Sequence, residues 1–413
     1  MRLHRYAVFE PAPITEASKI GPASPDLAFG GLPQQAIGDP LSALEGIGDL
    51  STPAEPSQVS FVRGAEPPEP VEGGFAVRAP LMPVRLISHM ATAAEKGPGE
   101  PWGLEAVGAT ESEFTGAGVC VAVLDTGIDG GHPAFAGLIR KDNYEDFTNT
   151  GLIDKSGHGT HCAGIIFGRD MSGQRIGVAR GVDKVLIGKI ADNDTLTSTE
   201  QIEKALIWAL GKGADIISMS VGLDFLAHTR ELRAMNVPEE AAIALALTDY
   251  RDYAQYFDLL MARIVSPGRI GRSALVVAAA GNESHADGNP SYRIAATLPA
   301  TASDVVSVGA LGRDGGMLHV APFSNERVNI CAPGVGILSA AAGGGLGTMT
   351  GTSQAAPHVA GVAALWHQKL RRDFFRAPSP SMVRESLLGR AEFAAISPRA
   401  NFIEIGRGLA RAP

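Results

Sequence analysis

From residue 102 onward, short apolar runs alternate with helical segments, and this rhythm restricts the fold more than any other feature of the chain. Runs without polar alternation are typical of strands buried on both faces, and intervening helices favour parallel pairing. The sequence therefore predicts an α/β fold with a doubly wound parallel sheet and helices on both faces. The predicted strands are 119–124, 184–190, 215–221, 274–280 and 305–311, and the clearest helices are 199–210 and 353–370.

The first hundred residues differ in kind, because 15 of the 27 prolines fall within residues 1–101. Only residues 5–9, 58–62 and 74–88 resemble strands, and residues 40–50 resemble a short helix. A small α+β domain and a partly ordered extension both fit this pattern. We therefore divide the chain into a proline-rich N-terminal region with a linker, residues 1–101, and a main domain, residues 102–413.

One stretch of the main domain, residues 224–272, does not follow the alternation of strands and helices. Pro238 is a good helix start, and apolar residues then recur at spacings of three and four. The pattern predicts a helical insertion that either packs as an extra hairpin or lines a site. The residues of its apolar face are Tyr250, Tyr253, Phe257, Leu260 and Ile264.

Charge and cysteine content narrow the functional classes. The net charge of −9 argues against a nucleic-acid surface. The three cysteines are too few and too scattered for a disulfide framework, which favours a reducing compartment. No stretch resembles a secretory leader or a membrane span, so a cytoplasmic protein without nucleic-acid or membrane partners is expected.

Three motifs place reactive side chains at the boundaries of predicted elements. Asp125 ends a buried strand, His158 opens an apolar helix among small residues, and Ser353 lies in the first turn of a helix after a glycine-rich approach. Taken singly, each has an ordinary interpretation as a cap or turn residue. Together they match the division of labour that peptide-bond cleavage requires.

The chemistry assigns a role to each residue. A serine hydroxyl is a poor nucleophile at neutral pH, so an imidazole must take its proton and later deliver it to the leaving amine. A carboxylate then orients the imidazole. This predicts Ser353 as nucleophile, His158 as base and acid, and Asp125 as its partner, with the Asn282 amide and the Ser353 backbone N–H as oxyanion hole.

These motifs resemble those of the subtilisin-like serine peptidases (peptidase family S8). Asp125-Thr126-Gly127, His158-Gly159-Thr160-His161 and Gly351-Thr352-Ser353 match the three family signatures in the family's chain order. The resemblance covers about residues 102–370 and implies a serine endopeptidase that works through an acyl-enzyme. It also implies that a protein or peptide substrate lies as an added strand between two edges, Ser220-Val221-Gly222 and Ala279-Ala280-Gly281.

The same resemblance suggests that the N-terminal region is a pro-domain and an intramolecular inhibitor. We then expect a zymogen that cuts itself between His89 and Trp102, and narrow specificity if the insertion at 224–272 overhangs the cleft. No cofactor is expected to be required. The side chain of Ala134 has no oxygen where many relatives bind calcium, which leaves Asp170 as a candidate calcium ligand elsewhere.

Two alternatives stay open at this point. The acyl-enzyme can be intercepted by an amine, which would make the protein a peptide-maturing or transpeptidating enzyme. A catalytically silent relative could instead bind a peptide through the same groove. Cys162, one helical turn after His158, is expected on the same face as the imidazole.

Overall fold

The computed structural model describes residues 4–10, 58–64, 75–87, 100–192, 197–265 and 272–413. The chain divides into two compact units, Met1–Val77 and Arg78–Pro413. A three-stranded sheet in the order β2-β1-β3 is formed by β1 (His4–Glu10), β2 (Gln58–Gly64) and β3 (Phe75–Ala79), with β1 and β2 antiparallel. Strands thus occur where the sequence predicts them, and the predicted helix at 40–50 lies outside the described residues.

The second unit is built on an eight-stranded sheet whose main path runs β13-β12-β11-β9-β5-β7-β6, with β14 also paired to β12. Each pair is parallel except β12 with β13. This confirms the predicted α/β class. The strands are β5 (Cys120–Asp125), β6 (Tyr144–Asp146), β7 (Lys184–Lys189), β9 (Ile216–Met219), β11 (Leu275–Ala279), β12 (Val305–Asp314), β13 (Met317–Val320) and β14 (Ile330–Pro333).

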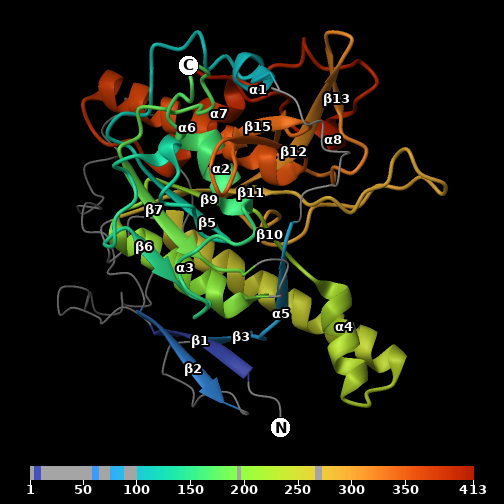
Figure 1. Ribbon diagram of the computed structural model, residues 1–413. Coiled ribbons are helices and arrows are strands. Elements are labelled where there is room, and N and C mark those ends of the chain that lie inside the picture. The colour runs from blue at the N-terminus through green and yellow to red at the C-terminus, as the bar shows by residue number, and fades with distance from the viewer. Residues whose placement is uncertain (1–3, 11–57, 65–74, 88–99, 193–196, 266–271) are drawn as a thin grey trace, which may run out of the picture. The chain divides into compact units, whose positions relative to one another are not determined.

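Helices cover both faces of this sheet. In Figure 1, α2 (His158–Phe167) and α6 (Thr352–Phe374) lie above the strands, and α3 (Thr199–Lys212) lies below them. Every residue of α2 is buried, because the helix is enclosed by α6, β5 and the hairpin of β15 and β16. The remaining short elements are α1 (Trp102–Ala106), a 3₁₀ turn (Pro133–Phe135), β15 (Ile337–Ala340), β16 (Leu346–Met349), α7 (Pro380–Gly389) and α8 (Phe402–Ile405).

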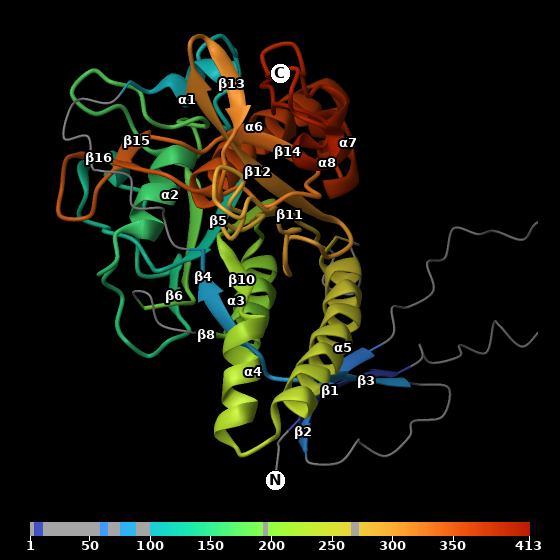
Figure 2. The ribbon, with the colours of Figure 1, turned by 90° about the vertical axis from the view of Figure 1, so that its right-hand side faces the viewer.

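The stretch 224–272 forms a helical hairpin, as its pattern predicts. Helix α4 (Phe225–Ala234) packs on α5 (Glu239–Val265), which begins directly after Pro238 (Figure 2). A buried hydrogen bond between His228 Nε2 and Asp249 Oδ2, 2.8 Å apart, joins the two helices. Among the described helices, none combines the length and apolar character that a membrane crossing requires.

A second, smaller sheet in the same unit has the order β10-β4-β8. Its central strand, β4 (Pro83–Leu86), runs antiparallel both to β10 (Val221–Leu223) and to β8 (Thr197–Ser198) (Figure 2). The sequence places residues 83–86 in the N-terminal region, yet they belong to the compact unit that begins at Arg78. The predicted strand at 74–88 is therefore two strands, β3 and β4, in separate sheets.

Helix α2 packs closely against β15 at Gly164, so a larger residue at this position should destabilise the protein. A Cβ there would overlap the Ser339 hydroxyl and lie 3.0 Å from both Cβ and N of Ala340. Gly164→Ala should lower the free energy of unfolding by about 1–3 kcal/mol, the usual cost of overpacking. Urea unfolding of the Ser353→Ala protein, followed by tryptophan fluorescence, measures it.

Gly211 of α3 provides the matched control, because no atom lies within 4 Å of its hypothetical Cβ. Gly211→Ala should leave stability unchanged or raise it by about 0.5 kcal/mol through helix propensity. Equal stabilities of the two variants would contradict the packing argument.

Candidate active site

The carboxyl end of β5 and the first residue of α2 meet in the interior of the protein. His158 Nδ1 lies 2.7 Å from Asp125 Oδ1, and both side chains are buried. His158 Nε2 is also buried and has no hydrogen-bond partner among the described residues. The ring is thus oriented by the carboxylate on one side and keeps a nitrogen available on the other.

Asp154 fixes the start of α2 relative to the end of β5, and sequence reasoning missed it. Its carboxylate accepts hydrogen bonds from Thr126 Oγ1 at 2.8 Å, from Gly157 N at 2.8 Å and from Thr160 N at 2.9 Å. Gly157, with φ of +78°, allows the sharp entry into the helix. The only sequence signal was a carboxylate four residues before His158.

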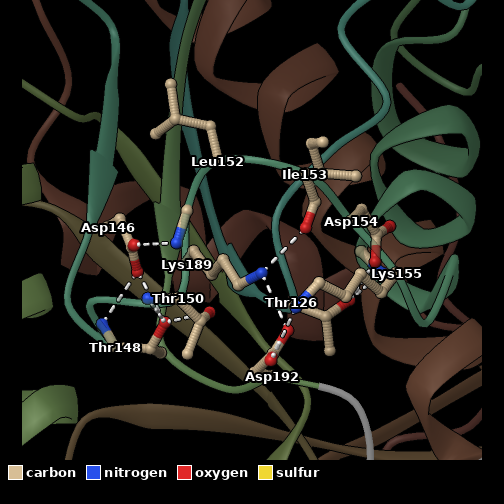
Figure 3. A network of polar contacts seen from close by, with 12 residues as sticks. Thr126, Asp146, Thr148, Thr150, Leu152, Ile153, Asp154, Lys155, Lys189 and Asp192 are labelled. Atoms are coloured by element: carbon tan, nitrogen blue, oxygen red, sulfur yellow. Dashed lines mark hydrogen bonds and ion pairs between the residues drawn. The ribbon is translucent and has the colours of Figure 1, made fainter.

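The side chain of Lys189 contacts the backbone next to Asp154 (Figure 3). Lys189 ends β7 and lies opposite Asp125 in the backbone register of β7 with β5. Its side chain is fully buried. The ammonium group donates to the Ile153 carbonyl at 2.8 Å and to Asp192 Oδ1 at 3.0 Å. Lys189 therefore holds the backbone immediately before Asp154, which in turn holds the His158 helix.

Cys162 lies one turn after His158, on the face predicted for it. Its sulfur is 3.8 Å from His158 Nδ1, and the thiol donates to the Ser353 carbonyl at 3.2 Å. Burial raises the pKa of this thiol, so it stays protonated at neutral pH. Cys162 thus links the beginnings of α2 and α6 as a neutral packing group.

The beginning of α6 brings Ser353 beside the loop that carries Asn282. Thr352 donates to Asn282 Oδ1 twice, from its backbone N at 2.9 Å and from its hydroxyl at 2.8 Å. These bonds fix the amide oxygen of Asn282 at the first residue of α6. Because Ser353 lies in the first helical turn, its N–H belongs to the group that lacks an intrahelical acceptor.

The chain itself occupies the space next to Ser353. The Ser353 hydroxyl donates to the carbonyl oxygen of Ile87 at 2.6 Å, directly after the end of β4. The Ile87 N–H donates to the Ser220 carbonyl at 2.9 Å, which continues the ladder between β4 and β10. The structure thus places a peptide carbonyl against the serine that the sequence singles out as nucleophile.

Of the two predicted substrate edges, Ser220-Val221-Gly222 contacts the segment that ends at Ile87, whereas the second partner of β4 is β8. Val221 and Gly222 pair with β4, and a Cβ on Gly222 would lie 3.8 Å and 3.9 Å from Ile87 Cγ1 and Cδ1. The second ladder runs along β8, at Thr197 and Ser198, which sequence reasoning did not single out. Ala279, Ala280 and Gly281 are buried where β11 leads into Asn282.

The histidines of the three motifs differ in their titration. Burial lowers the pKa of His161 to about 3 and that of His358 to about 4, so both stay neutral. Burial alone would lower the pKa of His158 too, but the nearby Asp125 carboxylate outweighs burial and raises it well above its ordinary value. Of the three, His158 is the one whose pKa is raised above that of an ordinary imidazole.

Two acidic positions bear on metal binding. Asp170 pairs with Arg180 at 2.8 Å, so its carboxylate already has a cationic partner. Asp125, His158 and Cys162 are a group of described side chains whose potential ligand atoms lie within 4.8 Å of one another.

Comparison with known proteins identifies the family of the chain. The model of the subtilase family matches residues 116–401. The chain is 31% identical over 336 residues to an intracellular serine protease of Paenibacillus polymyxa, covering 79% of this chain and 90% of the relative. It is 30% identical to the major intracellular serine protease of Bacillus subtilis (strain 168), covering 70% and 82%.

A solved structure gives the same result for the fold. Fervidolysin from Fervidobacterium pennivorans, a keratinolytic enzyme related to subtilisin, superposes with a TM-score of 0.56 at 25% identity. The match covers 79% of this chain and half of that chain. Fold, family model and relatives agree: this chain belongs to the subtilase family and is a subtilisin-like serine protease.

Proposed function

We propose that the protein is an endopeptidase in which Ser353 is the nucleophile, His158 the general base and acid, and Asp125 the residue that orients the imidazole. The Asn282 NH₂ group and the Ser353 backbone N–H form the oxyanion hole. Substrates bind as an extended strand between β10 and β8. Each of these groups comes from the chain itself, so the proposed reaction needs no cofactor.

The proposed reaction follows from this arrangement. Ser353 Oγ attacks the substrate carbonyl carbon while its proton passes to His158 Nε2, a buried nitrogen that has no hydrogen-bond partner in the described part of the chain. Negative charge that develops on the carbonyl oxygen is stabilised by the two donors. The imidazolium, stabilised by Asp125, then protonates the leaving amine, and a water molecule activated by the same imidazole hydrolyses the acyl-enzyme.

The position of β4 is the single observation that carries this proposal. An extended segment pairs on both sides with the small sheet and presents the Ile87 carbonyl to Ser353. This is the geometry that a substrate strand needs, since main-chain ladders give affinity and alternate side chains give specificity. A merely structural strand would have no reason to end with its carbonyl at the serine hydroxyl.

The same geometry supports the proposal that the protein is a zymogen that cuts itself, with β4 as its intramolecular inhibitor. The bond presented to Ser353 is the one that follows Ile87. This moves the proposed cleavage site from the interval between His89 and Trp102, expected from the sequence, to the bond between Ile87 and Ser88. Most of that earlier interval lies outside the described residues.

The helical insertion supports narrow specificity. Helix α4 contacts β4, and Asp224 N, at the start of α4, donates to the Pro83 carbonyl at 3.0 Å. Beside this contact lies a cavity of about 460 Å³, lined in part by Met82 and Glu231. A substrate residue placed like Met82 would meet the insertion as well as the sheet edges.

A reducing compartment such as the cytoplasm is proposed for the protein. Cys120, Cys162 and Cys331 are all buried and unpaired with one another, which suits an environment that keeps thiols reduced. Two of the relatives named above are themselves described as intracellular.

Replacement of the nucleophile tests the function directly. Ser353→Ala should abolish hydrolysis of a fluorogenic peptide mixture and leave the full-length chain intact, while the wild type yields a fragment that ends at Ile87. Intact-mass spectrometry and the peptide assay measure both effects. Ser381→Ala, on the exposed side of α7, is the control and should behave like the wild type. A cleavage product of equal yield in the Ser353→Ala protein would refute the proposal.

The oxyanion assignment has its own test. Asn282→Ala should lower kcat by about 10²–10³, the loss measured in subtilisin itself for its corresponding amide. Asn282→Asp keeps an oxygen that accepts from Thr352 but lacks the NH₂ donor, and it should lose as much. Steady-state kinetics on a peptide substrate measures both variants. Near-normal kcat in either one would contradict this role.

The dependence of activity on pH follows from His158. The base must be neutral, so kcat/KM should rise with pH through the pKa of His158. Because Asp125 raises that pKa, the midpoint should lie above the ordinary value of 6.5. Asp125→Asn removes the raising charge, so the residual activity should show a lower midpoint. A wild-type midpoint clearly below 6.5 would contradict this assignment.

A further inference from the structure

We propose that Glu283 forms a subsite for a cationic side chain, and that the preferred substrates carry arginine or lysine at the third residue before the cleaved bond. This inference rests on the proposed peptidase function and specifies its substrate class. It is carried by the contacts of Arg85 in the strand that occupies the cleft.

The register of β4 defines the position. Ile87 precedes the bond presented to Ser353 and is therefore the first residue before it. Leu86 pairs with Val221 and Arg85 with Gly222, which makes Arg85 the third residue before that bond.

Arg85 differs from its neighbours in the strand. The side chains of Val84, Leu86 and Ile87 are buried, with exposed fractions of 4% or less, whereas that of Arg85 is 39% exposed. Its guanidinium group forms an ion pair with the carboxylate of Glu283. The cleft therefore accepts apolar side chains around one cationic side chain.

Glu283 is held in place by the protein rather than by Arg85 alone. Its Oε2 accepts from Asn325 Nδ2 at 2.5 Å, and its backbone N donates to Asn325 Oδ1 at 3.1 Å. Asn325 is fully buried and also donates to the Ala280 carbonyl at 3.2 Å. The carboxylate is thus fixed on the loop that carries Asn282, and a cation need not reorganise it on binding.

The ion pair of Arg85 with Glu283 is partly exposed to solvent. This exposure limits how much a cation at this position can favour binding. Exposed or half-exposed ion pairs change equilibria by about two- to fivefold. A substrate carboxylate at this position should be repelled by Glu283, which should lower kcat/KM. Glu283 thus acts as a specificity determinant and leaves the chemical step to other groups.

Peptide hydrolysis tests the inference. Fluorogenic peptides Pro-Val-Xaa-Leu-Ile, with Xaa as Arg, Gln or Glu, follow the sequence of β4 and Ile87. The wild type should cleave the Arg peptide with a kcat/KM about two- to fivefold above that for Gln, and the Glu peptide more slowly still. Glu283→Gln should reduce the ratio of Arg to Gln to about one. Glu385→Gln, on α7, is the matched control and should keep the wild-type ratio.

A second measurement needs no catalysis. In the full chain carrying Ser353→Ala, Arg85→Gln and Glu283→Gln should each speed hydrogen exchange of the Ile87 amide about two- to fivefold, and the double variant no more than either one. Equal wild-type kcat/KM for the Arg and Gln peptides, or unchanged exchange in both single variants, overturns the inference. If no peptide is hydrolysed, the proposed function fails, and exchange still decides whether the subsite exists.

Discussion

The buried pair of Asp125 and His158 is the interaction on which the rest of the site depends. A carboxylate removed from water is stable only when donors surround it, and removal of one partner leaves an uncompensated buried charge. Thr126 meets this demand: its backbone N donates to Asp125 Oδ1 at 2.8 Å, and its hydroxyl donates to Asp154, which ties the end of β5 to the beginning of α2. Lys189 holds the Ile153 carbonyl next to Asp154. Rigidity in this corner follows from the cost of burying charge.

The second determinant of the site is a ladder of backbone hydrogen bonds. Strand β4 has partners on both sides, and the carbonyl of Ile87, directly after the strand, accepts a hydrogen bond from Ser353. Side chains then select at a finer level: Gly222 leaves room beside a branched aliphatic group, and Glu283 meets the guanidinium of Arg85. The proposed catalytic amide of Asn282 and the proposed selectivity residue Glu283 thus lie next to each other on one loop.

The fold class and the main candidate site residues could be predicted from the sequence, because the pattern of neighbouring residues was enough to indicate them. Continuous apolar runs identified the parallel strands, and Pro238 identified the start of α5. Asp125, His158, Ser353 and Asn282 lie at element boundaries that the pattern exposes. By contrast, the contacts of Asp154, Glu283 and β8 join residues that are distant in sequence. The residues around Asp154 do not indicate that Thr126 donates to it, and Arg85 and Glu283 are far apart along the chain. The split of residues 74–88 into two strands likewise depends on partners that only folding provides.

The double-sided slot around β4 has a consequence for what the protein can digest. A substrate that binds as β4 does would need unpaired backbone groups for a ladder of three residue pairs with β10 and of two with β8. Helices and interior strands already use those groups within their own fold, and only extended loops, tails or unfolded polypeptides leave them unused. A substrate that binds as β4 does would therefore be selected by its backbone conformation before its side chains, and the secondary structure of a compact protein would protect it from cleavage.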